Sequence, residues 1–147
     1  MTCLRSIAVG PFSVLVLLAT MSCGSNRQLQ TVALQPATAD AKDFPNGQVP
    51  FLATGTFSKP PSPVPLTSKD VTWCYGGPAN VANPTAGICA GNIAPAVTVD
   101  ANGLAQCAAN AQGTFFVLAG KTSTNLMGNP DAGPQFTIFG SAQLTCP

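Results

Sequence analysis

The six cysteines are the residues of this chain best suited to chemistry, because its sequence contains neither His nor Glu. Without an imidazole, a Ser-His-Asp or Cys-His site cannot be built in its usual form. Glycoside hydrolysis would have to draw on five scattered Asp residues, and no motif supports a Ser-Lys dyad. The inventory therefore predicts a protein that is not an enzyme.

Four of the cysteines follow residue 30, at positions Cys74, Cys89, Cys107 and Cys146. Successive separations of 15, 18 and 39 residues lack the close pairs that a four-thiolate zinc site requires. In an oxidising compartment, four cysteines most often form two disulfides, for which three connectivities exist. The spacing favours disulfides and predicts no metal site.

The N-terminal segment has the organisation of an export signal. Arg5 precedes the apolar stretch Val14–Ala19, which is too short to span a bilayer as a permanent helix. The sequence Ser22–Ser25 that follows resembles the lipobox of bacterial lipoproteins. This resemblance implies a signal peptide over 1–22, a lipid-modified Cys23 and a polar tether over 23–29. Ordinary secretion and an uncleaved anchor are the alternatives, and all three place the chain outside the cytoplasm.

The remaining 125 residues (147 minus 22) are enough for one domain, which we expect to cover 30–147. Without Arg5, five basic residues balance five Asp, so there is no basic patch for nucleic acid. After residue 22, no apolar run approaches the roughly 20 residues that a spanning helix needs. With 14 Gly and 14 Pro in the chain, a turn-rich β domain fits best.

Apolar residues alternate with polar ones between turn signals, which predicts strands. Val49, Phe51, Ala53 and Phe57, for example, share one phase. In the last segment, Phe136, Ile138, Ala142 and Leu144 are predicted to share one face. The apolar run 115–119 is predicted to be central or covered on both faces. The fold predicted is all-β, an Ig-like antiparallel β-sandwich of about seven strands. The predicted strands cover 31–35, 49–58, 71–75, 97–99, 104–107, 115–119 and 135–146, with loops at 59–65 and 76–95.

Residues 30–120 resemble the bacterial Ig-like group 2 family. The matching pieces are Thr31–Pro36, Ala53–Phe57 after an Asn-Gly turn, Lys69–Trp73, Val97–Leu104, and Gly113-Thr114 before an apolar strand. The resemblance implies a sandwich without catalytic residues or a cofactor. Proteins of this family have adhesive, sugar-binding and spacer roles. Trp73, central in its strand, is predicted to anchor the core rather than to stack on a sugar.

The phases of the strands favour one disulfide pairing. Cys74 is out of phase with Trp73, so its natural partner is Cys89 in the adjoining loop. Cys107 and Cys146 both face inward, so a bond between them would cross the core. Cys74–Cys107 with Cys89–Cys146 remains the alternative.

Two further groups of residues are candidates for binding. Tyr75, Phe116, Leu118 and Phe139 lie off or at the end of a core phase, and together they would form an exposed apolar patch. Asp100–Gly103 resembles part of a calcium loop, but a hairpin turn explains its residue types better.

We therefore predict a non-enzymatic, extracytoplasmic Ig-like module of a bacterial lipoprotein. Its partner would be a membrane, reached through the lipid on Cys23, and its role structural or adhesive at the cell surface or in the periplasm. The alternative is a carbohydrate- or protein-binding module that uses the 76–95 loop and exposed aromatic residues.

Overall fold

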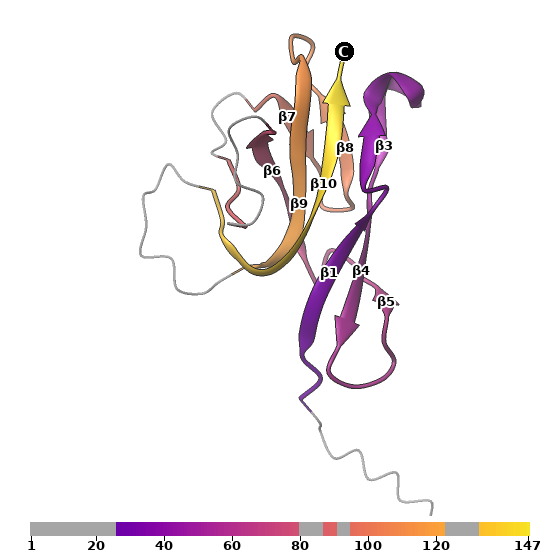
Figure 1. The fold of residues 1–147 in the computed structure, drawn as a ribbon, viewed down its shortest axis with the longest axis vertical. Helices are drawn as coiled ribbons and strands as arrows, with labels where there is room; N and C mark the ends of the chain where they lie inside the picture. The colour runs from indigo at the N-terminus through magenta and orange to yellow at the C-terminus, as the bar shows by residue number, and fades with distance from the viewer. Residues whose placement is uncertain (1–25, 80–86, 91–94, 123–132) are drawn as a thin grey trace, which may run out of the picture.

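The computed structural model describes residues 26–79, 87–90, 95–122 and 133–147, which form ten β-strands and two short 3-10 turns. The described residues contain no α-helix, and thus no helix that could cross a membrane. The strands form three small sheets, and all pairs except one are antiparallel (Figure 1). The prediction of an all-β fold is confirmed, but the described residues form ten strands in three sheets, not about seven strands.

The sheets take their strands from distant parts of the chain. The first has the order β1-β4-β5, the second β2-β10-β9-β6 and the third β3-β8-β7. In the second sheet, β2 lies parallel to β10. The strands are β1 (Leu29–Gln35), β2 (Thr38–Asp40), β3 (Gln48–Pro50), β4 (Leu52–Phe57), β5 (Val64–Pro65), β6 (Thr72–Pro78), β7 (Val97–Val99), β8 (Leu104–Cys107), β9 (Gly113–Thr122) and β10 (Phe136–Cys146), with the turns η1 (Ala41–Asp43) and η2 (Pro45–Gly47) between β2 and β3.

The first and third sheets are linked through one stretch of chain, because only Phe51 separates β3 from β4. The Phe51 amide donates to the Gly103 carbonyl at 2.9 Å, which joins this stretch to the turn before β8. Val49, Phe51 and Ala53 are buried in alternation, as their shared phase predicts.

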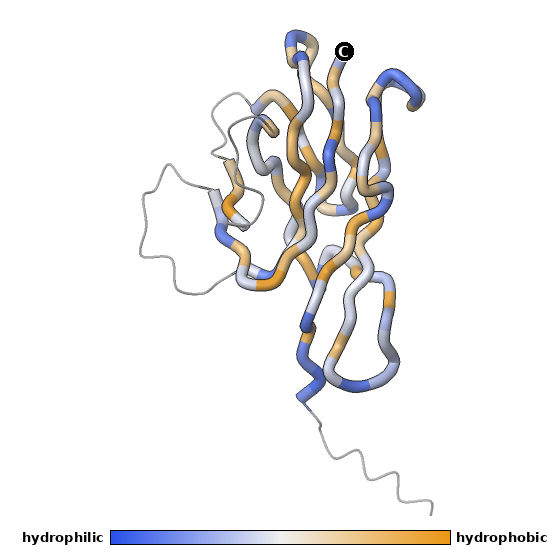
Figure 2. The backbone as a smooth tube through the Cα atoms, in the orientation of Figure 1, coloured by the Kyte–Doolittle hydropathy of each residue, from blue (hydrophilic) through white to orange (hydrophobic). Residues whose placement is uncertain are grey.

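One hydrophobic core receives side chains from all three sheets. Its largest fully buried members are Phe51, Leu144, Val49, Val97 and Val117. The hydropathy colouring places polar segments at both ends of the molecule, at the turns around η1 and at the chain near β5, with apolar residues along the strands between them (Figure 2). The strand faces thus pack on one another, while the turns meet solvent.

The central strand β9 is covered on both faces. It lies between β10 and β6, and residues 115–120 are all buried. Its odd-numbered residues Phe115, Val117 and Ala119 enter the main core, whereas Phe116 and Leu118 belong to a second cluster on the other side of the sheet. The apolar run in both phases predicts this arrangement.

Several predicted boundaries differ from the structure. β6 continues through a register shift between Tyr75 and Gly77 to Pro78, so the loop predicted from residue 76 begins later. The chain from Arg27 onwards already contacts the domain, so the predicted tether over 23–29 is too long. Phe136 does not share the face of Ala142, because the register of β10 shifts between Phe136 and Ile138.

Candidate functional site

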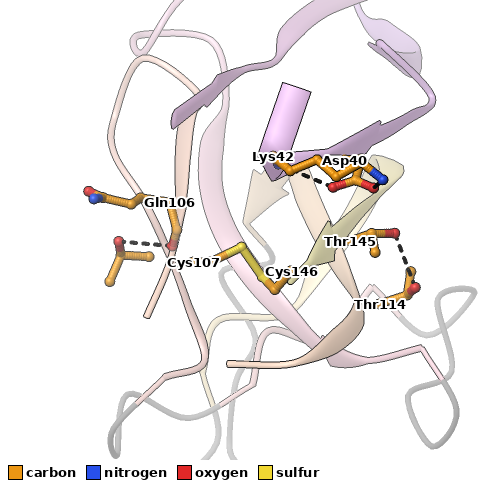
Figure 3. Close-up of a disulfide and its surroundings, with 8 residues drawn as sticks. Asp40, Lys42, Gln106, Cys107, Thr114, Thr145 and Cys146 are labelled. Carbon is orange, nitrogen blue, oxygen red and sulfur yellow. Dashed lines mark hydrogen bonds and ion pairs between the residues drawn. A yellow bond between two sulfur atoms is a disulfide. The ribbon is translucent and has the colours of Figure 1, made fainter. Parts of the chain in front are cut away.

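The disulfide Cys107–Cys146 links two sheets across the main core. Its Cα atoms lie 5.9 Å apart, on β8 of the third sheet and β10 of the second (Figure 3). Cys146 is buried in the core, and Cys107 packs against it. This bond is the one that the inward phases of both cysteines favour.

The disulfide Cys74–Cys89 connects β6 to the short segment 87–90, with a Cα–Cα distance of 5.8 Å. Three hydrogen bonds also hold the segment: Cys89 N donates to Pro134 O at 3.0 Å, Ala90 N to Tyr75 O at 2.7 Å, and Phe136 N to Gly87 O at 2.7 Å. The segment therefore spans from β6 to the start of β10.

Segment 87–90 covers a second hydrophobic cluster on the outer face of the β6-β9-β10 sheet. Its buried members are Cys89, Phe116, Leu118 and Phe136, and the Cys74 and Phe139 side chains pack against them. Cys74 lies directly opposite Leu118 in the β6–β9 ladder, so both side chains are on the covered face.

The prediction of an exposed apolar patch at Tyr75, Phe116, Leu118 and Phe139 is wrong for two of its four members. Phe116 is 8% and Leu118 1% exposed, because the Cys89 segment lies over them. Tyr75 is half-buried against the main core, 6.0 Å from the Phe115 ring between centroids, and burial raises the pKa of its hydroxyl. Phe139 is half-buried in the second cluster. The out-of-phase Cys74 and its predicted bond to Cys89 already implied that the residues around Cys89 lie over this face.

Trp73 is buried in the main core, as its position in the strand predicts. The turn Asp100–Gly103 lies against its ring: a Cβ atom added at Gly103 would be 2.7 Å from Trp73 Cζ2 and 2.5 Å from the Phe51 carbonyl oxygen. Gly103 has φ +84°, so this position favours glycine on two grounds.

The Asp100 carboxylate organises the hairpin turn between β7 and β8. Its Oδ1 accepts hydrogen bonds from the amides of Asn102 and Leu104, both at 2.8 Å. An Asp that receives backbone donors in this way is typical of an Asx turn. In residues 26–79, 87–90, 95–122 and 133–147, no group of three or more Cys or Asp side chains could hold a metal ion.

Two other carboxylates also serve local turns. Asp40 accepts from the Lys42 amide at 3.1 Å and forms an ion pair with Lys42 Nζ at 2.7 Å (Figure 3). The hydrogen bond to the Lys42 side chain, helped by that to its amide, lowers the pKa of Asp40, and the same pair raises the pKa of Lys42. The Thr67 amide and hydroxyl donate to Asp70 at 2.9 and 2.8 Å, which lowers the pKa of Asp70.

The remaining site predictions fall outside the described residues. They are the lipid-modified Cys23 and, within the predicted 76–95 loop, residues 80–86 and 91–94. The chain matches no known protein-family model, and comparison with curated proteins and with solved structures finds no significant match. The likeness to bacterial Ig-like group 2 domains and to lipoproteins thus stays a prediction. The two disulfides indicate an oxidising, extracytoplasmic setting.

Proposed function

We propose that the chain is a non-enzymatic, extracytoplasmic module of a lipoprotein, built as an Ig-like β-sandwich and anchored to a membrane through Cys23. Its role is structural or adhesive, at the cell surface or in the periplasm. Disulfides form and persist in oxidising compartments, and a covalent bond between two sheets suits a structural module there.

The observation that carries the proposal is the Cys107–Cys146 bond between two sheets that share one core around Trp73. A ring of 39 residues stabilises the fold by about 4 kcal/mol in the chain-entropy treatment. The chain enters the fold at the end near β5, and β10 finishes at the opposite end (Figure 1). Entry and exit at opposite ends suit a spacer that carries one end of the module away from its anchor.

The alternative role, binding a glycan or a protein through the 76–95 loop and exposed aromatic residues, loses part of its support. Phe116 is buried, and Tyr75 and Phe139 are half-buried in two different clusters. The three rings therefore do not form one open platform of the kind on which a sugar stacks.

The anchor is tested by intact mass of the exported protein, before and after reduction. We expect the mature chain to begin at Cys23, to carry acyl groups, and to gain four hydrogen atoms on reduction, two for each disulfide. Cys23→Ser is the matched control and should abolish acylation while leaving the domain folded. A mature chain that begins elsewhere and carries no lipid would overturn the anchor.

The structural role is tested with glycan arrays and pull-downs, using the wild type and a variant in which a Gly-Ser linker replaces residues 80–86. A spacer predicts that both proteins behave alike. Saturable binding by the wild type that the variant loses would favour the binding module instead.

A further inference from the structure

The end of the domain near β5 holds the incoming chain at Arg27. The Arg27 Cζ atom lies 3.8 Å from the centroid of the Phe57 ring. Its Nε donates to the Lys59 carbonyl at 3.2 Å, and its Nη2 donates to the Pro61 carbonyl. The side chain thus clamps the chain to residues 58–63, which we call the β4–β5 loop.

Backbone contacts reinforce this clamp. The Gln28 amide donates to Ser58 Oγ at 3.0 Å, and the Ser58 amide donates to the Gln28 carbonyl at 2.9 Å. Within the loop, Ser62 Oγ accepts from the Phe57 amide at 2.9 Å. The incoming chain and the β4–β5 loop are therefore fixed together from Arg27 onwards.

The clamp limits how far the domain can stand from an anchor. Arg27 follows Cys23 by four residues, which span at most about 14 Å even when fully extended. If Cys23 carries lipid, as proposed above, its position is at the headgroup level of a bilayer. Arg27 then lies within that reach of the headgroups, whatever the conformation of the residues between, and the β4–β5 loop lies beside Arg27.

Charge differs between the two ends of the domain. The β4–β5 loop contains exposed Lys59 and no carboxylate, and Arg27 adds a second positive charge beside it. Asp70 lies within Coulombic range of Arg27, and the charge of Lys69 offsets that of Asp70. At the opposite end, around η1, Asp40 and Asp43 outnumber Lys42. An anionic leaflet attracts basic side chains within a Debye length of its surface.

We propose that the β4–β5 loop is the membrane-facing end of the anchored domain and rests against anionic phospholipid headgroups through Lys59 and Arg27. The end that carries η1 and the Cys107–Cys146 bond then points away from the bilayer. This inference rests on the anchor at Cys23, but its test does not depend on acylation in the cell.

For the test, a maleimide phospholipid is coupled to the Cys23 thiol of the chain that begins there, with both disulfides formed. The protein is placed on phosphatidylcholine vesicles that contain phosphatidylglycerol. Acetylation of each lysine is followed by mass spectrometry and compared with the uncoupled protein. We expect Lys59 to react severalfold more slowly on the vesicles and Lys42 to react at an unchanged rate.

Two variants separate proximity from nonspecific shielding. A flexible Gly/Ser insertion between Ser25 and Asn26 should restore the reactivity of Lys59. Arg27→Ala removes one basic side chain but leaves the Gln28–Ser58 hydrogen bonds, so it should restore the reactivity of Lys59 only in part. Near-ultraviolet circular dichroism of Trp73 checks that both variants stay folded. Equal protection of Lys59 and Lys42, or a Lys59 rate that coupling leaves unchanged, would overturn the proposal. If Lys59 were protected to the same extent on vesicles of pure phosphatidylcholine, the anionic headgroups would have no role in the contact.

Discussion

Gly103→Ala tests the packing of the β7–β8 turn on Trp73, and Gly113→Ala is its matched control. Both glycines have positive φ, +84° at Gly103 and +101° at Gly113, so alanine is strained at either position. That strain costs about 1–2 kcal/mol at each. At Gly103 the new methyl group would also approach Trp73 Cζ2 to 2.7 Å and the Phe51 carbonyl oxygen to 2.5 Å. At Gly113 it would meet no atom within 4 Å.

Overpacking a filled core costs about 1–3 kcal/mol, so Gly103→Ala should destabilise the fold by about 2–5 kcal/mol and Gly113→Ala by about 1–2 kcal/mol. Urea unfolding followed by the fluorescence of Trp73, the single tryptophan, measures both free energies of unfolding. The reasoning would be refuted if the two variants lost the same stability, since only the close contacts at Gly103 distinguish them.

Three other perturbations address the covered face and the turns. In urea unfolding, Leu118→Ala should cost about 2–5 kcal/mol of stability, whereas Leu52→Ala, at 69% exposure, should cost less than about 0.5 kcal/mol. Equal losses would contradict the burial of Leu118 beneath segment 87–90. Replacing Cys74 and Cys89 together by Ala should cost about 3 kcal/mol of stability and should let the folded protein bind a hydrophobic dye such as ANS. A variant that bound no dye would contradict the covering role of segment 87–90. Folding lowers the pKa of Asp70, so the stability that its carboxylate contributes is complete above about pH 4 and is lost as the pH falls through the lowered pKa. Asp70→Asn should therefore reduce the loss of stability on acidification, and an unchanged dependence of stability on pH would exclude this contribution.

Local patterns predicted those parts of the fold that depend on neighbouring residues. The alternation of Val49, Phe51 and Ala53 identified the buried side of this extended stretch, although Phe51 divides the predicted strand 49–58 into β3 and β4. The unbroken apolar run of β9 indicated burial on both sides. The hairpin around Asp100 followed from residue types that suit its turn. In each case the residues that form the sequence pattern are the same short segment that adopts the predicted structure.

The incorrect predictions concern contacts between distant segments. Phe116 was expected at the surface although the apolar run of β9 indicated cover on both faces, because nothing in the strand itself identifies the distant Cys89 segment as the cover. Phe136 changed face because of a single register shift, which an alternating pattern cannot reveal. The three-residue β2 has too few residues to show a period, and it exists through parallel pairing with the far end of the chain. The Arg27 clamp likewise depends on carbonyl groups more than thirty residues away.

The strand β9 also bears on the solubility of the chain. Phe115–Ala119 is apolar throughout, without charge, Pro or Gly, which is the composition of segments that stack into intermolecular cross-β assemblies. In the folded protein, the core shields one side of this segment and the disulfide-fastened residues 87–90 shield the other. A cell that kept the chain in a reducing compartment would lose the second shield, and we expect the protein to aggregate there. For this sequence, oxidative folding therefore also protects the chain against self-association.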